Sequence, residues 1–291
     1  MTDLLSEYSF IVYDAIIYIA LAMVFFLIGK IVYQFLHPDI RVKSELVDQD
    51  NLAFALSHTG YFVGLLIAIG SAIVGPSHGL LKDIIDISVY GALAIVLLNI
   101  SVFITDKVLL RKFSVRKEIV EDRNAGAGII EGAVSIASGL IIFGAVTGES
   151  SNMTAGIISA VVFWAIGQVL LIITSRIYNM ITPYDIHEHL EQDNVAVGIG
   201  YAGVIIAMGN LIRFGLSGDL VSWQTTLVDA GIEIVIGLIL LPVMRFLTDK
   251  ILLPGARLTD EIVNQEKPNL GAAIIEAFSY IGGSILITWC L

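Results

Sequence analysis

Residues 121–149 have the sequence EDRNAGAGIIEGAVSIASGLIIFGAVTGE, and residues 266–291 have the related sequence EKPNLGAAIIEAFSYIGGSILITWCL. In each stretch an asparagine opens an apolar helix and a single glutamate follows seven residues later: Asn124 with Glu131, and Asn269 with Glu276. A carboxyl group in a helix of membrane-spanning length costs roughly 2.5–3.5 kcal/mol at the bilayer centre on insertion scales. Because both copies keep the acid, the two glutamates are our first candidates for functional groups.

The composition predicts an integral membrane protein. Of the 291 residues, 56% are hydrophobic and 15% are charged, and the mean hydropathy is +0.86. Soluble domains are usually about 25% charged. The formal net charge of −11 also argues against a nucleic-acid partner, because phosphate binding requires a basic face.

Apolar runs long enough to cross a bilayer predict an all-α membrane protein with eight transmembrane helices. The first run is about twice as long as the apolar core of a signal peptide and has no basic region before it, so we interpret it as a retained span. The predicted spans are 9–36, 51–74, 84–110, 125–147, 154–181, 194–213, 226–253 and 269–291.

The chain is an internal duplication. Asp50-Asn51 returns 143 residues later as Asp193-Asn194, and ITDKVLL at 104–110 returns as LTDKILL at 247–253. After a two-residue insertion the shift becomes 145, which relates Asn124 to Asn269. We therefore expect two four-helix repeats, residues 1–150 and 151–291. An even number of spans in each unit makes the repeats parallel.

The distribution of Lys and Arg predicts the orientation. Fourteen of them lie at the helix ends and loops after the odd-numbered spans, and only Lys82 and Arg213 lie at the other face. Since Lys and Arg prefer the cytoplasmic side, both termini are expected to be non-cytoplasmic. The asparagines then open their helices at the cytoplasmic end, with each glutamate roughly 10 Å deeper.

The leading candidates for a transport or ion-binding site are carboxylates and amides at this level of the membrane. Hard cations take oxygen ligands, and the duplicated residues would supply several. Two other interpretations stay open: each glutamate could hydrogen-bond a neighbouring span or pair with Lys107 or Lys250, and the Asp-Asn pairs could be helix N-caps only. The candidates are Glu131, Glu276, Asn124, Asn269, Asp50, Asn51, Asp193 and Asn194.

For a second group of polar residues the sequence favours a role in transport less strongly. Asp106 and Asp249, in the two Thr-Asp-Lys motifs, could instead anchor helix ends. His58 could relay protons or make helix contacts, and Tyr201 occupies the equivalent position of the other half. Three acids near the outer face could attract cations or be solvated helix starts. These secondary candidates are Asp106 and Asp249, His58, and Asp86, Asp229 and Glu233.

The motifs favour neither an enzyme nor a metal or cofactor site. His187 and His189 are two residues apart, so they do not share a helix face. The sequence shows no nucleophilic side chain accompanied by a suitable general base and an orienting acid, so nothing in it predicts an enzyme. The basic loop 111–123 could contact anionic lipid or a cytoplasmic partner, although an orientation signal would look the same. A homo-oligomer stays possible.

The duplicated unit resembles the bacterial inner-membrane YjfL family, a four-helix domain of unknown function that occurs singly or in tandem. The resemblance covers nearly the whole chain and is most specific in EDRNAGAGIIEGAVSIASGLI, residues 121–141. The second unit departs from it with Lys267-Pro268 in place of Asp122-Arg123 and Leu270 in place of Ala125. The resemblance implies a bacterial inner-membrane location, often beside envelope-stress proteins of the phage-shock type, and no settled activity.

Two functional hypotheses follow. The first is a transporter or channel for protons or small cations, in which Glu131 and Glu276 are the exchanging carboxylates. The alternative is a non-transporting scaffold that docks an envelope-stress or lipid-remodelling partner through the loops at 37–50, 111–123 and 255–268.

Overall fold

The computed structural model describes residues 2–74, 77–108, 117–148, 150, 152–218, 222–253 and 255–291, without the side chains of residues 2–11, Asp106, Thr226, Glu233 and Leu241. Within these residues the chain is helical and contains no strand. Eight of its helices are long and apolar enough to cross a membrane. The prediction of an all-α, eight-span membrane protein is confirmed.

The eight long helices lie close to the predicted spans. They are α1 (Thr2–Leu36), α2 (Leu52–Gly70), α3 (Leu80–Val108), α4 (Ala125–Val146), α5 (Met153–Ile181), α7 (Val195–Leu216), α8 (Trp223–Leu247) and α10 (Leu270–Cys290). The sequence analysis did not predict the short helical segments between them. These are η1 (Ser44–Asp48), η2 (Lys117–Glu121), α6 (Ile186–Glu191), η3 (Thr248–Leu252) and α9 (Leu258–Val263).

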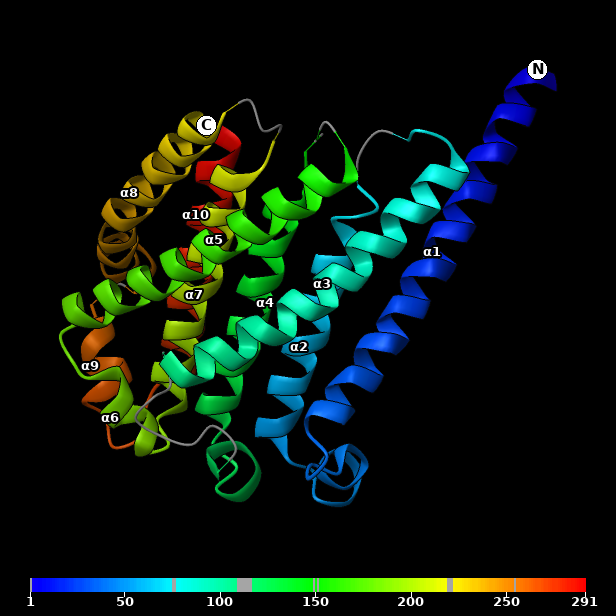
Figure 1. The fold of residues 1–291 in the computed structure, drawn as a ribbon. Coiled ribbons are helices and arrows are strands. Elements are labelled where there is room, and N and C mark those ends of the chain that lie inside the picture. The colour runs from blue at the N-terminus through cyan, green and yellow to red at the C-terminus, as the bar shows by residue number, and fades with distance from the viewer. Residues whose placement is uncertain are drawn as a thin grey trace.

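The short segments show a smaller repeat inside each half. One long helix, one or two short helical segments and one asparagine-capped helix follow each other four times along the described chain. The four asparagine-capped helices are α2, α4, α7 and α10. Each of these smaller repeats has two long helices and so crosses the membrane twice. The four asparagine-capped helices therefore all begin at the same end of the bundle, and both chain termini lie at the opposite end (Figure 1).

The four asparagine-capped helices form a row in chain order. The most extensive contacts in the molecule join α2 to α4, α4 to α7, and α7 to α10. The other long helices pack against this row: α3 and α5 lie over its middle, and α8 contacts α7 and α10. Because α4 and α7 come from different halves, the two repeats form one continuous bundle.

Glycines allow neighbouring helices of the row to meet at their backbones. A Cβ atom on Gly60 of α2 would lie 2.1 Å from the Cα of Gly132 in α4, and one on Gly198 of α7 would lie 2.6 Å from the Cα of Gly126. Small residues at such crossings are typical of membrane helix packing, where van der Waals contact between close backbones drives association. These glycines therefore permit the close approach of α2 to α4 and of α4 to α7.

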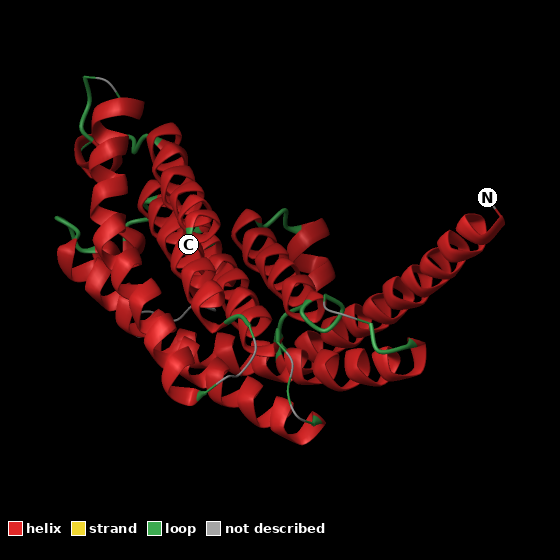
Figure 2. Cartoon of the chain, turned by 90° about the horizontal axis from the view of Figure 1, so that it is seen from above, coloured by secondary structure: helices red, strands yellow, loops and turns green. Residues whose placement is uncertain are grey.

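The outer helices present apolar side chains to the surroundings. In the most apolar part of α1 only 11% of the residues are buried, and its N-terminal part projects beyond the bundle (Figure 2). Phe35 is 80% exposed and Trp289 of α10 is 77% exposed. Such faces require the hydrocarbon of a lipid bilayer, so the chain is a multi-pass membrane protein. The side that faces the cytoplasm stays a prediction.

Candidate functional site

Each of the four predicted asparagines caps its own helix. The side-chain oxygen of Asn51 accepts from Phe54 N at 3.1 Å, and that of Asn124 accepts from Ala127 N at 3.0 Å. Asn194 and Asn269 do the same with the third residue after them, at 3.2 Å and 3.1 Å. These bonds satisfy one of the free N–H groups at each helix start.

In three of the four asparagines the amide nitrogen also connects neighbouring helices of the row. Asn51 donates to the carbonyl of Ile119 at 2.9 Å, Asn124 to that of Leu190 at 2.7 Å, and Asn194 to that of Ile262 at 2.9 Å. Each acceptor lies in the short segment that precedes the next helix of the row. The last asparagine, Asn269, donates to the side chain of Glu261 at 2.8 Å. The asparagines therefore set the relative depth of the helix starts.

The residues before these asparagines lie in the left-handed backbone region at three of the four starts. The φ angles are 48° at Asp50, 56° at Arg123 and 58° at Asp193. Asp and Asn tolerate this conformation better than most residues, and all three side chains are exposed. Proline, whose ring holds φ negative, occupies the fourth position as Pro268. Asp50 and Asp193 thus belong to the turns at the surface of this end.

Glu131 lies at the contact between α4 and α2. Its Oε2 accepts a hydrogen bond from the hydroxyl of Ser57 at 2.8 Å, and its side chain stays partly accessible. Among the described residues no Lys, Arg or His forms an ion pair with it. The acid therefore has one neutral hydrogen-bond donor and an accessible side.

Glu276 lies at the equivalent place in α10 but has different surroundings. Its residue exposure is 0%, and its Oε1 lies 2.5 Å from Nη1 of Arg245 on α8. The hydroxyl of Tyr280 also donates to Oε1, at 3.2 Å. Its other oxygen, Oε2, is buried without a hydrogen-bond partner among the described residues. Glu276 is thus a buried ion-pair member with one unused acceptor.

One substitution between the halves accounts for part of this difference. At the shift of 143 residues, Ser57 corresponds to Gly200 and Val102 corresponds to Arg245. A Cβ on Gly200 would lie 2.6 Å from Oε2 of Glu276. The second half therefore lacks the serine that binds Glu131, has space for the carboxylate at the glycine, and supplies an arginine instead.

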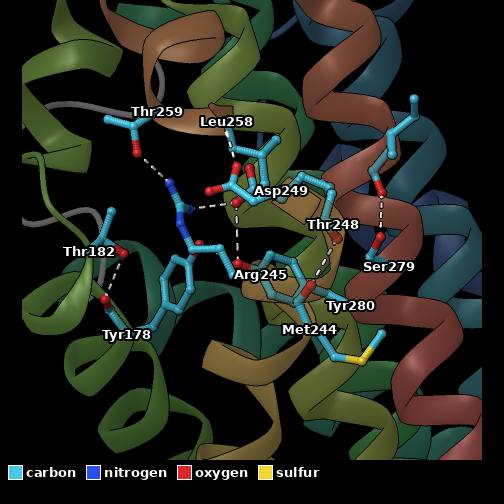
Figure 3. A network of polar contacts seen from close by, with 12 residues as sticks. Tyr178, Thr182, Met244, Arg245, Thr248, Asp249, Leu258, Thr259, Ser279 and Tyr280 are labelled. Atoms are coloured by element: carbon cyan, nitrogen blue, oxygen red, sulfur yellow. Dashed lines mark hydrogen bonds and ion pairs between the residues drawn. The ribbon is translucent and has the colours of Figure 1, made fainter. Parts of the chain in front are cut away.

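A polar and aromatic cluster surrounds the Arg245–Glu276 pair (Figure 3). Nη2 of Arg245 donates to Thr259 Oγ1 at 3.0 Å, and the hydroxyls of Tyr178 and Tyr280 are 3.2 Å apart. The guanidinium lies 5.8 Å from the ring centroid of Tyr184, a cation–π distance. Burial, together with the negative charge of Glu276, raises the pKa of Tyr184 to about 12, so this phenol stays neutral at physiological pH.

The secondary candidates are distributed over the molecule and do not meet at the glutamates. Asp249 caps the short helix α9 by accepting from Leu258 N at 2.6 Å (Figure 3). His58 is 5% exposed and packs among aromatic rings. Asp86 and Asp229 lie near the starts of α3 and α8, at the other end of the bundle. The side chains of Asp106 and Glu233, and residues 111–116 of the basic loop, lie outside the described part.

The sequence analysis missed the partners of both glutamates. One open interpretation paired the glutamates with Lys107 or Lys250, but Glu276 pairs with Arg245, five residues before Lys250. Arg245 was counted there only as an orientation signal. A cation within an apolar span near a known intramembrane acid is a signal that would have identified it. Ser57 gave no such signal, because serines are common at helix contacts.

No cluster in the described residues has the composition of a metal site: there is no group of three or more His, Cys, Asp and Glu side chains that could hold an ion. Two pockets lie at the asparagine-capped end near α1, with volumes of about 880 Å³ and 450 Å³. Neither is lined by Glu131 or Glu276.

Comparison with known proteins identifies relatives but no activity. The chain is 22% identical over 268 residues, 91% of its length and 96% of the relative's, to a UPF0719 transmembrane protein of Aquifex aeolicus (strain VF5). It is 25% identical over 154 residues, 53% of its length and 99% of the relative's, to a UPF0719 transmembrane protein of Mycolicibacterium paratuberculosis (strain ATCC BAA-968 / K-10). No solved structure matches the chain.

The second of these relatives is matched almost in full by about half of this chain, as expected for a duplicated unit. A family model described as Domain of Unknown Function (DUF350) matches twice, at residues 4–146 and 152–291. The two matches cover nearly the whole length and follow the internal repeat. The chain therefore belongs to the DUF350 family and carries two copies of its domain.

Proposed function

We propose that this protein moves protons or small cations across a bacterial inner membrane, with Glu131 as the exchanging carboxylate. The observation that supports this proposal most directly is the contrast between the two acids. Glu131 is partly accessible and has only the neutral donor Ser57, whereas Glu276 is buried against Arg245. A carboxyl group without a fixed counter-charge can bind and release a cation without breaking an ion pair.

The second half has a different part in this proposal. Because the Arg245–Glu276 pair is buried, separating the two charges would leave both unsatisfied in a low-dielectric region. The pair therefore holds α8 against α10 and keeps the second acid out of exchange. The four asparagines fix the depth of both acids, and the exposed Asp50 and Asp193 attract cations toward that end.

The proposal keeps the predicted orientation and needs no chemical conversion. Both termini would face away from the cytoplasm, as the Lys and Arg bias predicts. The acids would then lie nearer the cytoplasmic leaflet. Such a protein carries ions and is not an enzyme, and it requires no cofactor.

Ion flux in proteoliposomes tests the proposal. Proton flux and the fluxes of Na⁺ and K⁺ are measured for the wild type, Glu131→Gln, Glu276→Gln and the surface control Glu191→Gln, whose side chain is exposed. We expect Glu131→Gln to abolish flux and Glu191→Gln to leave it unchanged. We expect Glu276→Gln to reduce the folded fraction while the folded molecules still conduct.

Two outcomes would overturn the assignment. Flux that persists in Glu131→Gln would remove Glu131 from the pathway. A wild type that conducts no tested ion would instead support the scaffold alternative, in which the loops at 37–50, 111–123 and 255–268 dock a partner.

A further inference from the structure

We propose that the groove between α1 and α2, at the asparagine-capped end of the bundle, binds one anionic phospholipid whose phosphate pairs with Lys30. The groove has a volume of about 880 Å³ and is lined by Lys30, Tyr33 and Gln34 of α1, by Val42 and by His58 of α2. This volume lies in the range of roughly 300–1,000 Å³ typical of sites for small molecules. The proposal is independent of ion transport.

Lys30 is the first reason for this assignment. It lies within the apolar span of α1, six residues before Leu36 ends the helix, and its side chain is exposed. Among the described residues no acid pairs with it. Six residues correspond to roughly 9 Å of helix, which a lysine side chain spans only in part by extending toward the headgroups. A lipid phosphate bound in the groove would neutralise the charge of Lys30 at its place in the helix.

The apolar lining is the second reason. Ile31 and Phe35 also line the groove, and they are 67% and 80% exposed on α1. The main helix contacts of α1 in the described chain are with α2 and α3. The groove is therefore open toward the bilayer, and an acyl chain can enter it sideways.

His58 is the third reason. Its ring packs within 4.5–5.1 Å, centroid to centroid, of Tyr33, Phe54 and Phe62. Its Nδ1 is buried and has no hydrogen-bond partner among the described residues. A buried polar atom without a partner costs free energy, which a bound acceptor oxygen would recover. His58 lines the groove, so a rotation of its ring would let Nδ1, in the tautomer that is protonated there, donate to a phosphate or ester oxygen of the lipid.

In the described residues the second half lacks the histidine of this site. The position of His58 is occupied in the second half by Tyr201, whose ring stacks on Tyr178 at 6.1 Å between centroids. The position of Lys30 is occupied in the second half by Ile173, so the proposed lipid site belongs to the first repeat.

Lipid retention tests the proposal. The protein is reconstituted with phosphatidylglycerol or phosphatidylcholine, extracted into detergent, and the lipids that stay bound are counted by native mass spectrometry. The variants are Lys30→Gln, His58→Phe and Val42→Trp, which fills the groove. Lys250→Gln is the matched control, because Lys250 is exposed at the same end but lies away from the groove.

We expect the wild type and Lys250→Gln to retain one phosphatidylglycerol in preference to phosphatidylcholine. Lys30→Gln should weaken phosphatidylglycerol binding roughly fivefold, the effect of one cation at a lipid surface. His58→Phe should weaken both lipids, and Val42→Trp should abolish retention of both. The thermal midpoint of each variant verifies that it is folded.

Three results would overturn the proposal. The first is an equal loss in Lys30→Gln and Lys250→Gln, because general surface attraction would then explain it. The second is a lipid still bound to folded Val42→Trp. The third is a wild type that retains no phospholipid.

Discussion

In the first half of the molecule Glu131 accepts one hydrogen bond from Ser57 and stays partly accessible, and in the second half Glu276 is fully buried against Arg245 and Tyr280. The two acids descend from one position and lie at equivalent places in their repeats. Duplication therefore kept the acid while divergence replaced its partner. A buried charge persists only if its surroundings compensate it, and the two halves use different compensation.

The comparison also separates a fixed acid from an accessible one. A carboxylate held by an arginine cannot lose its charge without leaving the cation unpaired. A carboxylate beside a serine has no such restriction. This asymmetry makes Glu131 in the first half better suited to cation exchange than Glu276. Substituting the partner of each acid in turn tests the comparison.

The largest effect is expected from Arg245→Met, which removes the cation from Glu276. Breaking a buried ion pair in this way costs about 3–5 kcal/mol of folding free energy. The double variant Arg245→Met/Glu276→Gln should recover most of that loss, since no unpaired charge stays behind. Unfolding of the purified protein in mixed detergent micelles measures both, with Val102→Met as the control at the equivalent position of the first half. Equal stability of Arg245→Met and the wild type would show that the Arg245–Glu276 pair does not contribute to the free energy of folding.

A smaller effect is expected from Gly132→Ala, which gives the first half the residue that the second half has as Ala277. The new Cβ would lie 2.8 Å from the carbonyl oxygen of Leu56, so α2 and α4 must move apart. Overpacking of this kind costs roughly 1–3 kcal/mol. Gly231→Ala is the control, because among the described residues no atom beyond the neighbouring backbone of its own helix lies within 4 Å of the added Cβ, and it should leave stability unchanged or slightly higher. The same unfolding assay would contradict this prediction if both substitutions had the same effect.

The smallest effect is expected from Ser57→Ala, which removes the hydrogen bond to Glu131. Hydrogen bonds between membrane helices contribute about 0.6 kcal/mol on average and at most about 1.7. The loss should disappear in a Glu131→Ala background, where the serine has no carboxylate to bind. A double-mutant cycle in the same micelles measures this coupling. A coupling of zero would mean that Ser57 and Glu131 do not interact in the folded protein.

Much of the architecture was predictable from local patterns. The lengths of the apolar runs predicted all eight helices, and the ends of α4 and α5 agree with prediction to within one residue. The asparagines at the helix starts were recognised as possible caps because asparagine favours helix N-termini. The fourfold repeat was missed, although Asn51, Asn124, Asn194 and Asn269 open the four helices of the row. The short segments before them, such as η2 and α6, are too brief to produce a periodic signal.

The sequence by itself determined the class of protein, the number of spans, the duplication and the position of the two acids along their helices. These properties depend on hydrophobic length and on the position of polar residues along one helix, which are local quantities. Tertiary structure alone decided that Arg245 meets Glu276, that Ser57 meets Glu131, and that three of the four asparagines bond to the segment before the next helix of the row. Such contacts depend on how far helices approach and rotate against each other, and glycines such as Gly60 and Gly200 set that approach only once the partner backbone or side chain is in place.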